Sequence, residues 1–244
     1  MTIGEPFSGN LPFTRVVHGL RRADIATVQR GLSRFDSEEP PTIQRTWEVH
    51  VPRDPAYDEP DDGVIRKVGR DGQDRKLFLH YRHNLSGLLT SKGIRLKLWQ
   101  CTWLAACSRI WTACATATDE LAREMDEARP DFRFAERVAE YRDQHVLRVV
   151  RYDPRPNGLA NEHSDRSAVT FRIVESHAGF YAKDGWGRIY LPTPATPEVD
   201  CFAGDQLEHI TKGGIRRVWH GADDTTGGTA TRFAVVFFGK MYPK

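Results

Sequence analysis

The sequence predicts an α+β protein in which a helical N-terminal half packs against a C-terminal β-core. Residues 94–127 carry apolar side chains at three- and four-residue steps, the spacing of a helix that buries one face. From His145 onward, short apolar runs alternate with turns rich in Gly, Pro and Asp. That alternation is typical of the strands of a sandwich or jelly roll.

Residues 1–144 are expected to be mostly helical or irregular. Helical spacing predicts a short helix at Leu20–Gln29, and a short strand is expected at Thr46–Val51. Val64–Arg82 has two apolar runs around a turn-rich tract, which indicates a hairpin.

The long helix expected at Ile94–Glu127 is closed by Pro130, and a shorter helix is expected at Phe134–Tyr141. The stripe of Trp, Leu, Ile and Cys along the long helix is interpreted as a face that packs on a sheet.

The β-core is expected at residues 145–240, and no linker divides the chain, so one domain is expected over residues 1–244. The expected strands are Val146–Tyr152, Ala168–Val174, Phe180–Ala182, Gly187–Leu191, Val199–Phe202, Leu207–Ile210, Ile215–His220 and Phe233–Phe238.

Composition excludes several classes of protein. A mean hydropathy of -0.54 and the lack of a long apolar run argue against a membrane protein. A net charge of +2 gives no support for nucleic-acid binding.

The compartment is expected to be the cytoplasm. The N-terminus lacks the basic segment and apolar core of a secretory signal. The four cysteines, Cys101, Cys107, Cys114 and Cys201, form no close pair of the redox or zinc-ribbon kind. Three of them lie in the predicted long helix and are interpreted as small core residues.

A possible metal site lies in the β-core. His163 and Asp165 are one residue apart at a predicted loop–strand junction, so their side chains project from the same face. His220 is a candidate third ligand that returns from a distant strand. Two histidines and one carboxylate form the facial triad of non-haem Fe(II) oxygenases, which leaves positions open for oxygen and substrate.

A buried arginine is predicted on the last strand. Alternation puts Arg232 and Ala234 on one face of that strand, together with Val236 and Phe238. If this face is the interior, the guanidinium needs a carboxylate partner, and two parallel hydrogen bonds make the best grip. No acidic residue on a neighbouring strand is an obvious partner, so a ligand carboxylate is expected.

These motifs occur in an order that resembles the iron- and 2-oxoglutarate-dependent oxygenases of the isopenicillin N synthase-like branch. The resemblance covers about residues 146–240 and is faint before residue 140. The segments that carry it are Arg151-Tyr152-Asp153-Pro154, His163-Ser164-Asp165, Ser167-Ala168-Val169-Thr170-Phe171, Gly204-Asp205-Gln206-Leu207, Ile210-Thr211-Lys212-Gly213, His220, Thr231-Arg232 and Phe237-Phe238-Gly239.

The resemblance implies a double-stranded β-helix that binds Fe(II) through His163, Asp165 and His220. It implies that Arg232 holds the distal carboxylate of 2-oxoglutarate, with Tyr152 as a further hydrogen-bond donor. The implied reaction couples loss of carbon dioxide from 2-oxoglutarate to O2-dependent oxidation of a C–H bond in a small organic substrate. The expected outcome is hydroxylation, desaturation or ring formation, in a biosynthetic role, and the sequence leaves these alternatives open.

Two departures from the family pattern keep alternatives open. Ala234 stands where the family usually has a serine that helps to bind the same carboxylate, and Gly221 follows the distal histidine where arginine is common. Arg232 could then bind the carboxylate of the primary substrate, as in an iron oxidase that does without 2-oxoglutarate. A β-helix domain that binds a metal or ligand without catalysis is the third alternative.

The other polar residues of note receive plainer interpretations. Asp205 is expected in a turn, and His177 and His209 are not expected to be metal ligands. His80 and His83 are expected on the surface, with a substrate pocket as the alternative. Residues expected to line the pocket from the N-terminal half are Tyr81, Arg82 and Trp103.

Overall fold

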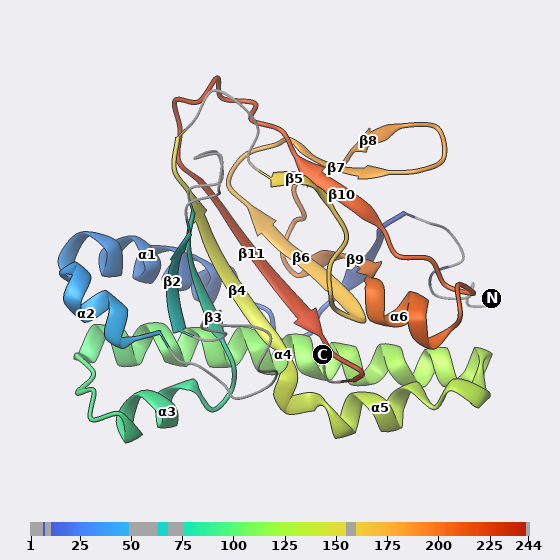
Figure 1. Ribbon diagram of the computed structural model, residues 1–244, viewed down its shortest axis with the longest axis horizontal. Coiled ribbons are helices and arrows are strands. Elements are labelled where there is room, and N and C mark those ends of the chain that lie inside the picture. Colours follow the sequence, from blue (N-terminus) through green and yellow to red (C-terminus); the bar gives the residue numbers. More distant parts are fainter. Residues whose placement is uncertain (1–6, 8–10, 49–62, 68–75, 155–159, 243–244) are drawn as a thin grey trace.

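The computed structural model describes residues 7, 11–48, 63–67, 76–154 and 160–242. Its core consists of two sheets, with the longest helix running across one face of the larger sheet (Figure 1). The larger sheet has seven strands in the order β1-β9-β6-β11-β4-β3-β2, and the smaller has four in the order β5-β10-β7-β8. All strand pairs in the described part of the chain are antiparallel.

From β4 onward, successive strands alternate between the two sheets, except that β7 and β8 form a hairpin within the smaller one, and this alternation is the connectivity of a jelly roll. The strands of the larger sheet are β1 (Phe13–Val16), β2 (Gly63–Lys67), β3 (Lys76–Tyr81), β4 (Val146–Tyr152), β6 (Val169–Glu175), β9 (Glu198–Ala203) and β11 (Arg232–Gly239). Those of the smaller sheet are β5 (Ala160–His163), β7 (Phe180–Lys183), β8 (Arg188–Tyr190) and β10 (Trp219–Ala222). The predicted α+β fold with a jelly-roll core is confirmed.

Alternation along the central strands separates the two faces of the larger sheet. On β11, Val235 and Phe237 are fully buried in the core that the sheet shares with the helices. Arg232 and Ala234 alternate with these residues along the strand, so their side chains point to the opposite face, toward the smaller sheet. The long predicted helix therefore covers one face, and the candidate site occupies the other.

The long helix α4 (Leu98–Ala128) runs below the larger sheet, and its left-hand part in the view lies beneath α1 (Arg22–Glu38) (Figure 1). Its buried side includes Trp103, Cys107 and Ile110, as the apolar spacing predicts. The other helices are α2 (Pro41–Thr46), α3 (Leu85–Ser91), α5 (Phe134–Glu140) and α6 (Asp205–Ile210), with 3-10 turns at Pro130–Phe132 and Arg142–Gln144.

The predicted hairpin at Val64–Arg82 is confirmed as β2 and β3, and it extends the C-terminal sheet. β3 pairs with β4 over its whole length, from Lys76 opposite Tyr152 to Tyr81 opposite Leu147. β1 adds a further N-terminal strand at the other edge. The N-terminal half thus supplies three of the seven strands, which the sequence pattern did not indicate for β1.

Two predicted strands are wrong. The segment expected as a strand at Leu207–Ile210 is the helix α6, with extended Gly204 before it and the acidic residues Asp205 and Glu208 in its first turn. Acidic side chains favour the first turn of a helix through its dipole, and this signal overrides a short apolar run. The strand expected at Thr46–Val51 begins inside α2, which ends at Thr46, and positions 49–51 lie outside the described residues.

The strand predicted at Ile215–His220 begins only at Trp219, as β10. The helix predicted at Leu20–Gln29 corresponds to the first part of α1, which continues to Glu38. Cys107, Cys114 and Cys201 are buried as expected, whereas Cys101 is exposed. Within the described part of the chain, no helix has both the length and the apolar character needed to cross a bilayer.

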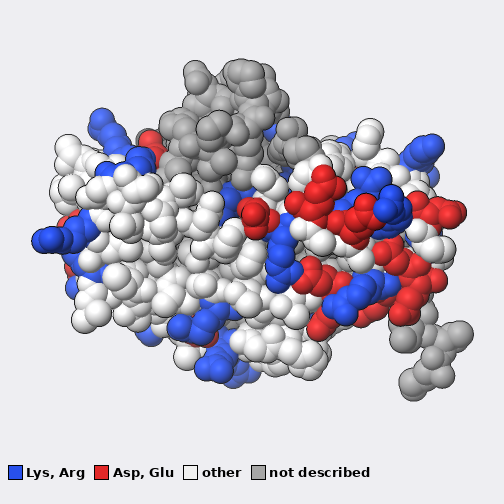
Figure 2. Space-filling model, turned by 90° about the horizontal axis from the view of Figure 1, so that it is seen from below, with Lys and Arg blue, Asp and Glu red and all other residues white. Residues whose placement is uncertain are grey.

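The face on the helix side carries charges of both signs. In Figure 2 acidic and basic side chains lie close together toward one end of this face, and no single sign covers the whole face. Arg15 of β1 illustrates the pairing, because its guanidinium forms two 2.8 Å hydrogen bonds with Glu124 of α4.

Candidate metal centre

The two candidate histidines lie directly opposite each other on paired strands of the smaller sheet. His163 ends β5 and His220 lies on β10, and their Cα atoms are partners in the register. The two ring centroids are 4.5 Å apart. The predicted return of the second histidine from a distant part of the chain is thus observed.

Backbone carbonyls hold both imidazole rings in one tautomer. Nδ1 of His163 lies 2.7 Å from the carbonyl oxygen of Asn161, and Nδ1 of His220 lies 3.2 Å from that of Val218. A carbonyl only accepts, so each Nδ1 must carry the proton and donate it. Each neutral ring then offers the lone pair of Nε2, the arrangement that a metal-binding histidine needs.

Asp165 lies between the two rings, in the turn between β5 and β6. Its Oδ1 is 3.6 Å from Nε2 of His163, and its Oδ2 is 3.5 Å from Nε2 of His220. The three ligand atoms lie within 4.8 Å of one another, and among the described residues these three form the one such group of His, Cys, Asp and Glu. His177 and His209 lie outside it, as expected.

The environment keeps Asp165 ionised. Burial alone would raise its pKa, but His220, His163 and a hydrogen bond from Thr170 hold the pKa well below its ordinary value. The Thr170 hydroxyl donates to Oδ2 over 2.8 Å. A carboxylate that is charged, buried and fixed by a hydrogen bond is a good ligand for a divalent cation.

The two histidines differ in exposure and in pKa. Burial lowers the pKa of His220, which packs against Phe180 and Phe202 with ring centroids 5.5 and 4.8 Å away. The side chain of His163 is 46% exposed, and its contact with the Asp165 carboxylate raises its pKa. His163 therefore faces the open side of the site and His220 the closed side.

The helix α6 fixes the loop that carries Asp165, a role not predicted from the sequence. The Asp205 amide donates to the carbonyl of Asp165 over 2.8 Å, and the Asp205 carboxylate accepts from the Ser164 hydroxyl at 2.5 Å. A Cβ on Gly204 would lie 2.7 Å from the carbonyl oxygen of Asp165, so only glycine allows this approach. Asp205 was expected as a simple turn residue.

Arg232 is buried in the interior, as predicted, but the expectation that no acidic residue partners it is wrong. Its Nη2 lies 2.7 Å from Oε2 of Glu175, and its side chain is 2% exposed. Glu175 lies on β6 opposite Ala234. An extra residue in β6 at this level shifts the pairing between Val235 and Val236, so Arg172 and Glu175, three residues apart, reach the same group of charges.

Tyr152 lies beside Arg232, since the two residues are partners in the register of β4 and β11. The same face continues through Phe78, Val150 and Ala234, which form a small apolar cluster with Tyr152 and Val236. This cluster lines the interior next to the guanidinium.

The residues expected to line the pocket from the N-terminal half lie elsewhere. Tyr81 and Trp103 belong to the core between the sheet and α4, so their prediction as pocket residues is wrong. Arg82 bonds the carbonyl of Gln144. His80 is half-buried, with its Nε2 accepting from Nε of Arg148 over 2.8 Å.

Comparison with known proteins finds a family match in the C-terminal part of the chain. Residues 143–240 match the sequence profile of the 2OG-Fe(II) oxygenase superfamily. The matched segment holds the three candidate metal ligands and Arg232. Fe(II), 2-oxoglutarate and O2 are the cofactor and cosubstrates that this superfamily uses. The resemblance noted in the sequence is confirmed for the superfamily, and the isopenicillin N synthase-like branch stays a prediction.

Solved structures share the fold of this protein over nearly the whole chain. The dioxygenase for auxin oxidation 1 of Arabidopsis thaliana, as a binary complex with 2-oxoglutarate, has a TM-score of 0.69 at 13% identity and covers 95% of this chain and 83% of its own. A Neurospora crassa protein in complex with alpha-KG and 5-formyluracil has a TM-score of 0.70 at 15% identity, with coverage of 93% and 73%.

The rice dioxygenase for auxin oxidation has a TM-score of 0.68 at 13% identity and covers 96% of this chain and 74% of its own. Identities this low establish a common fold. A comparison with curated protein sequences gives no match.

The side chains of the candidate site fit both groups that the matched superfamily uses. Two neutral imidazole nitrogens and one ionised carboxylate form a donor set suited to Fe(II). Nε and Nη2 of Arg232 are buried with no hydrogen-bond partner among the described residues. These two atoms form one edge of the guanidinium, the edge that grips a carboxylate by two parallel hydrogen bonds.

Proposed function

We propose that the protein uses Fe(II) and 2-oxoglutarate to oxidise an unactivated C–H bond of a small organic molecule. His163, Asp165 and His220 hold the iron in this proposal, and Arg232 holds the distal carboxylate of 2-oxoglutarate. The observation that carries it is the buried Nε and Nη2 edge of Arg232, which makes no directed hydrogen bond to any described residue and lies in the same jelly roll as the three ligands.

The chain's own residues have distinct tasks in this reaction. The carbonyls of Asn161 and Val218 keep both Nε2 atoms available, and Thr170 orients the Asp165 carboxylate. The three side chains would hold the iron from one side of the site and leave room for the cosubstrate on the other. Iron and 2-oxoglutarate, when bound, would supply the oxidant, while the protein orients the substrate.

Tyr152 is proposed as a second contact to the cosubstrate. It lies directly across the strand pair from Arg232, and both residues face the interior. A phenol hydroxyl is a hydrogen-bond donor, so it suits a carboxylate oxygen.

The substrate is proposed to be a small organic molecule, oxidised by hydroxylation, desaturation or cyclisation in a biosynthetic reaction. The similar proteins are described as acting on auxin or as binding a nucleobase, both small molecules. A cytoplasmic location is proposed with it, on the grounds of the unpaired cysteines.

An iron oxidase that does not use 2-oxoglutarate is the second candidate. It is favoured by Ala234, which cannot donate a hydrogen bond, and by Glu175, which already neutralises Arg232. A domain that binds a metal without catalysis is the third.

Untargeted mass spectrometry of metabolite extracts separates these candidates. The purified protein is incubated with extract, Fe(II), 2-oxoglutarate and O2, and each component is omitted in turn. The proposal expects ions that gain one oxygen or lose two hydrogens, together with succinate, only in the full mixture. Conversion without 2-oxoglutarate would favour the oxidase, and no conversion in any of the mixtures would favour the non-catalytic domain.

A further inference from the structure

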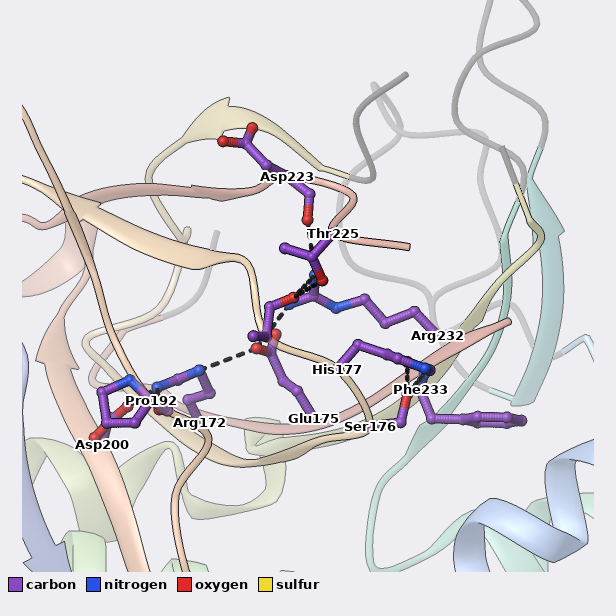
Figure 3. Close-up of polar contacts among 11 residues, drawn as sticks. Arg172, Glu175, Ser176, His177, Pro192, Asp200, Asp223, Thr225, Arg232 and Phe233 are labelled. Carbon is purple, nitrogen blue, oxygen red and sulfur yellow. Dashed lines mark hydrogen bonds and ion pairs between the residues drawn. The ribbon is translucent and has the colours of Figure 1, made fainter. Parts of the chain in front are cut away.

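The buried charges around Arg232 form a connected group that extends beyond the expected cosubstrate site. Figure 3 shows Glu175 between the side chains of Arg172 and Arg232, with Asp200 on the far side of Arg172. The side chains of both arginines are 2% exposed and that of Glu175 is 6% exposed. Charges buried to this degree are stable only when they are paired.

The hydrogen bond of Glu175 belongs to Arg172 and not to Arg232. Nη1 of Arg172 donates to Oε2 of Glu175 over 3.0 Å. Nη2 of Arg232 lies closer to the same oxygen, at 2.7 Å, yet it lacks hydrogen-bond geometry and remains without a directed acceptor among the described residues. Glu175 therefore neutralises the charge of Arg232 without using its hydrogen-bonding edge.

Arg232 is fixed independently of Glu175. Its Nη1 donates to the carbonyls of Ala178 and Asp223, each over 3.2 Å. A Cβ on Gly179 would lie 2.2 Å from the Asp223 carbonyl oxygen, so glycine at this position permits the clamp. The clamp orients the guanidinium, while its Nε and Nη2 edge stays available for a ligand carboxylate.

Arg172 is held just as firmly on its other side. Its Nε donates to Asp200 over 2.8 Å and its Nη2 to the carbonyl of Pro192 over 2.5 Å. Glu175 thus has a fixed, charged partner that does not depend on Arg232. When a ligand carboxylate approaches Arg232, the charge of Glu175 remains balanced by Arg172.

We propose that Glu175 is a built-in counter-ion that stands in for the carboxylate of 2-oxoglutarate at Arg232 and weakens its binding. This inference rests on the proposed function of Arg232. In the empty site Glu175 neutralises the buried guanidinium, and in the loaded site Glu175 and the ligand carboxylate lie against the same guanidinium. Repulsion between like charges at short range in the interior sets a ceiling on cosubstrate affinity. Glu175 acts through Arg232 and is a positioning residue.

The variant Glu175→Gln tests this proposal, because it keeps the shape and an acceptor oxygen but removes the charge. The dissociation constant of 2-oxoglutarate is measured by isothermal titration calorimetry on the Mn(II)-loaded protein, which cannot turn over. We expect 2-oxoglutarate to bind Glu175→Gln at least about tenfold more tightly than the wild type. A purely structural role for Glu175 would predict weaker binding, so the direction of the change decides.

Two further variants serve as controls. Asp200→Asn removes a carboxylate from the same group but not from Arg232, and we expect a clearly smaller gain in affinity. Glu175→Asp keeps the charge and is expected to bind 2-oxoglutarate like the wild type. An unchanged or weaker affinity in Glu175→Gln, or an equal gain in Asp200→Asn, would overturn the proposal.

A stability readout covers the case in which Glu175→Gln folds poorly. The rise in melting temperature on adding 2-oxoglutarate and Mn(II) reports binding to whatever folded protein is present. It is expected to be larger in Glu175→Gln than in the wild type, and an equal or smaller rise contradicts the proposal. If the wild type itself binds no 2-oxoglutarate, the proposed function of Arg232 fails first, and that result is distinct from failure of the Glu175 proposal.

Discussion

At the scale of single residues, the candidate metal site depends on side chains that are oriented before any metal arrives. The tautomers of His163 and His220 are fixed by main-chain carbonyls, and Asp165 is fixed by Thr170. Thr170 in turn lies 2.8 Å from the Ser167 hydroxyl. The predicted ligands thus have supporting contacts that a bare His-x-Asp pattern does not reveal.

Thr170→Val is expected to weaken Fe(II) binding by about tenfold or more, because it removes the hydrogen bond that orients the Asp165 carboxylate. Valine keeps the branched shape and the strand position. Anaerobic titration of the apoprotein with Fe(II) measures the change. Thr170→Ser retains the hydroxyl and should bind iron as the wild type does, and equal affinity in Thr170→Val would refute the role given to this contact.

Prediction from the sequence succeeds at the residues whose chemistry is carried by type and spacing. The His163, Asp165 and His220 group and the burial of Arg232 follow from alternation and order along the chain. Glu175 was missed because the extra residue in β6 breaks the alternation on which such predictions rest. Asp205 was predicted only as a turn residue, because its hydrogen bond with Ser164 joins segments whose proximity the sequence does not show.

At the scale of elements, the helices that support the sheet are packed closely. α1 and α4 meet where Gly31 faces the ring of Trp103, and a Cβ on Gly31 would lie 2.3 Å from the ring. The long helix was predicted well because a regular stripe over 31 residues is a strong signal. α6 was predicted as a strand because a segment of four residues is too short to distinguish helical from strand periodicity.

Gly31→Ala is expected to destabilise the protein by about 1–3 kcal/mol, because the added methyl group overpacks the contact with Trp103. This exceeds the gain of up to about 1 kcal/mol that alanine brings to a helix. Urea unfolding measures the difference.

Gly87→Ala is the matched control, since nothing lies within 4 Å of its added Cβ in the helix α3. We expect this variant to be neutral or slightly more stable. If the two variants unfold alike, the close α1–α4 contact does not limit stability.

At the scale of the whole molecule, the two faces of the larger sheet have different roles. One face of the larger sheet packs on α4 and supplies the main hydrophobic core, and the other face encloses the polar site. His145 lies on the core side, fully buried, and its Nδ1 accepts from the amide of Lys240 over 3.1 Å. It links the start of β4 to the end of β11.

Burial lowers the pKa of His145 to about 3, with the nearby Arg142, Lys240 and Arg82 acting in the same direction. In the unfolded chain its pKa is about 6.5, so the unfolded state binds the proton first as the pH falls. The stabilisation is complete above pH about 6.5 and is lost as the pH falls toward 3, by up to about 1.4 kcal/mol per pH unit.

Denaturant unfolding across this pH range tests the prediction with His145→Gln, which offers an acceptor but cannot take up the proton. The variant is expected to be less stable at neutral pH and to lose less stability on acidification than the wild type. Parallel pH profiles for the two proteins would exclude His145 as a source of acid sensitivity.

The central claim is that His163, Asp165 and His220 hold Fe(II) in the same interior in which Arg232 binds 2-oxoglutarate. Anaerobic addition of Fe(II) and then 2-oxoglutarate to the apoprotein tests it most directly, through the visible charge-transfer band of the iron chelate. We expect the band in the wild type, its loss in His163→Ala, and a higher 2-oxoglutarate requirement in Arg232→Ala. Iron binding without a band, or a band that His163→Ala leaves unchanged, would contradict the claim.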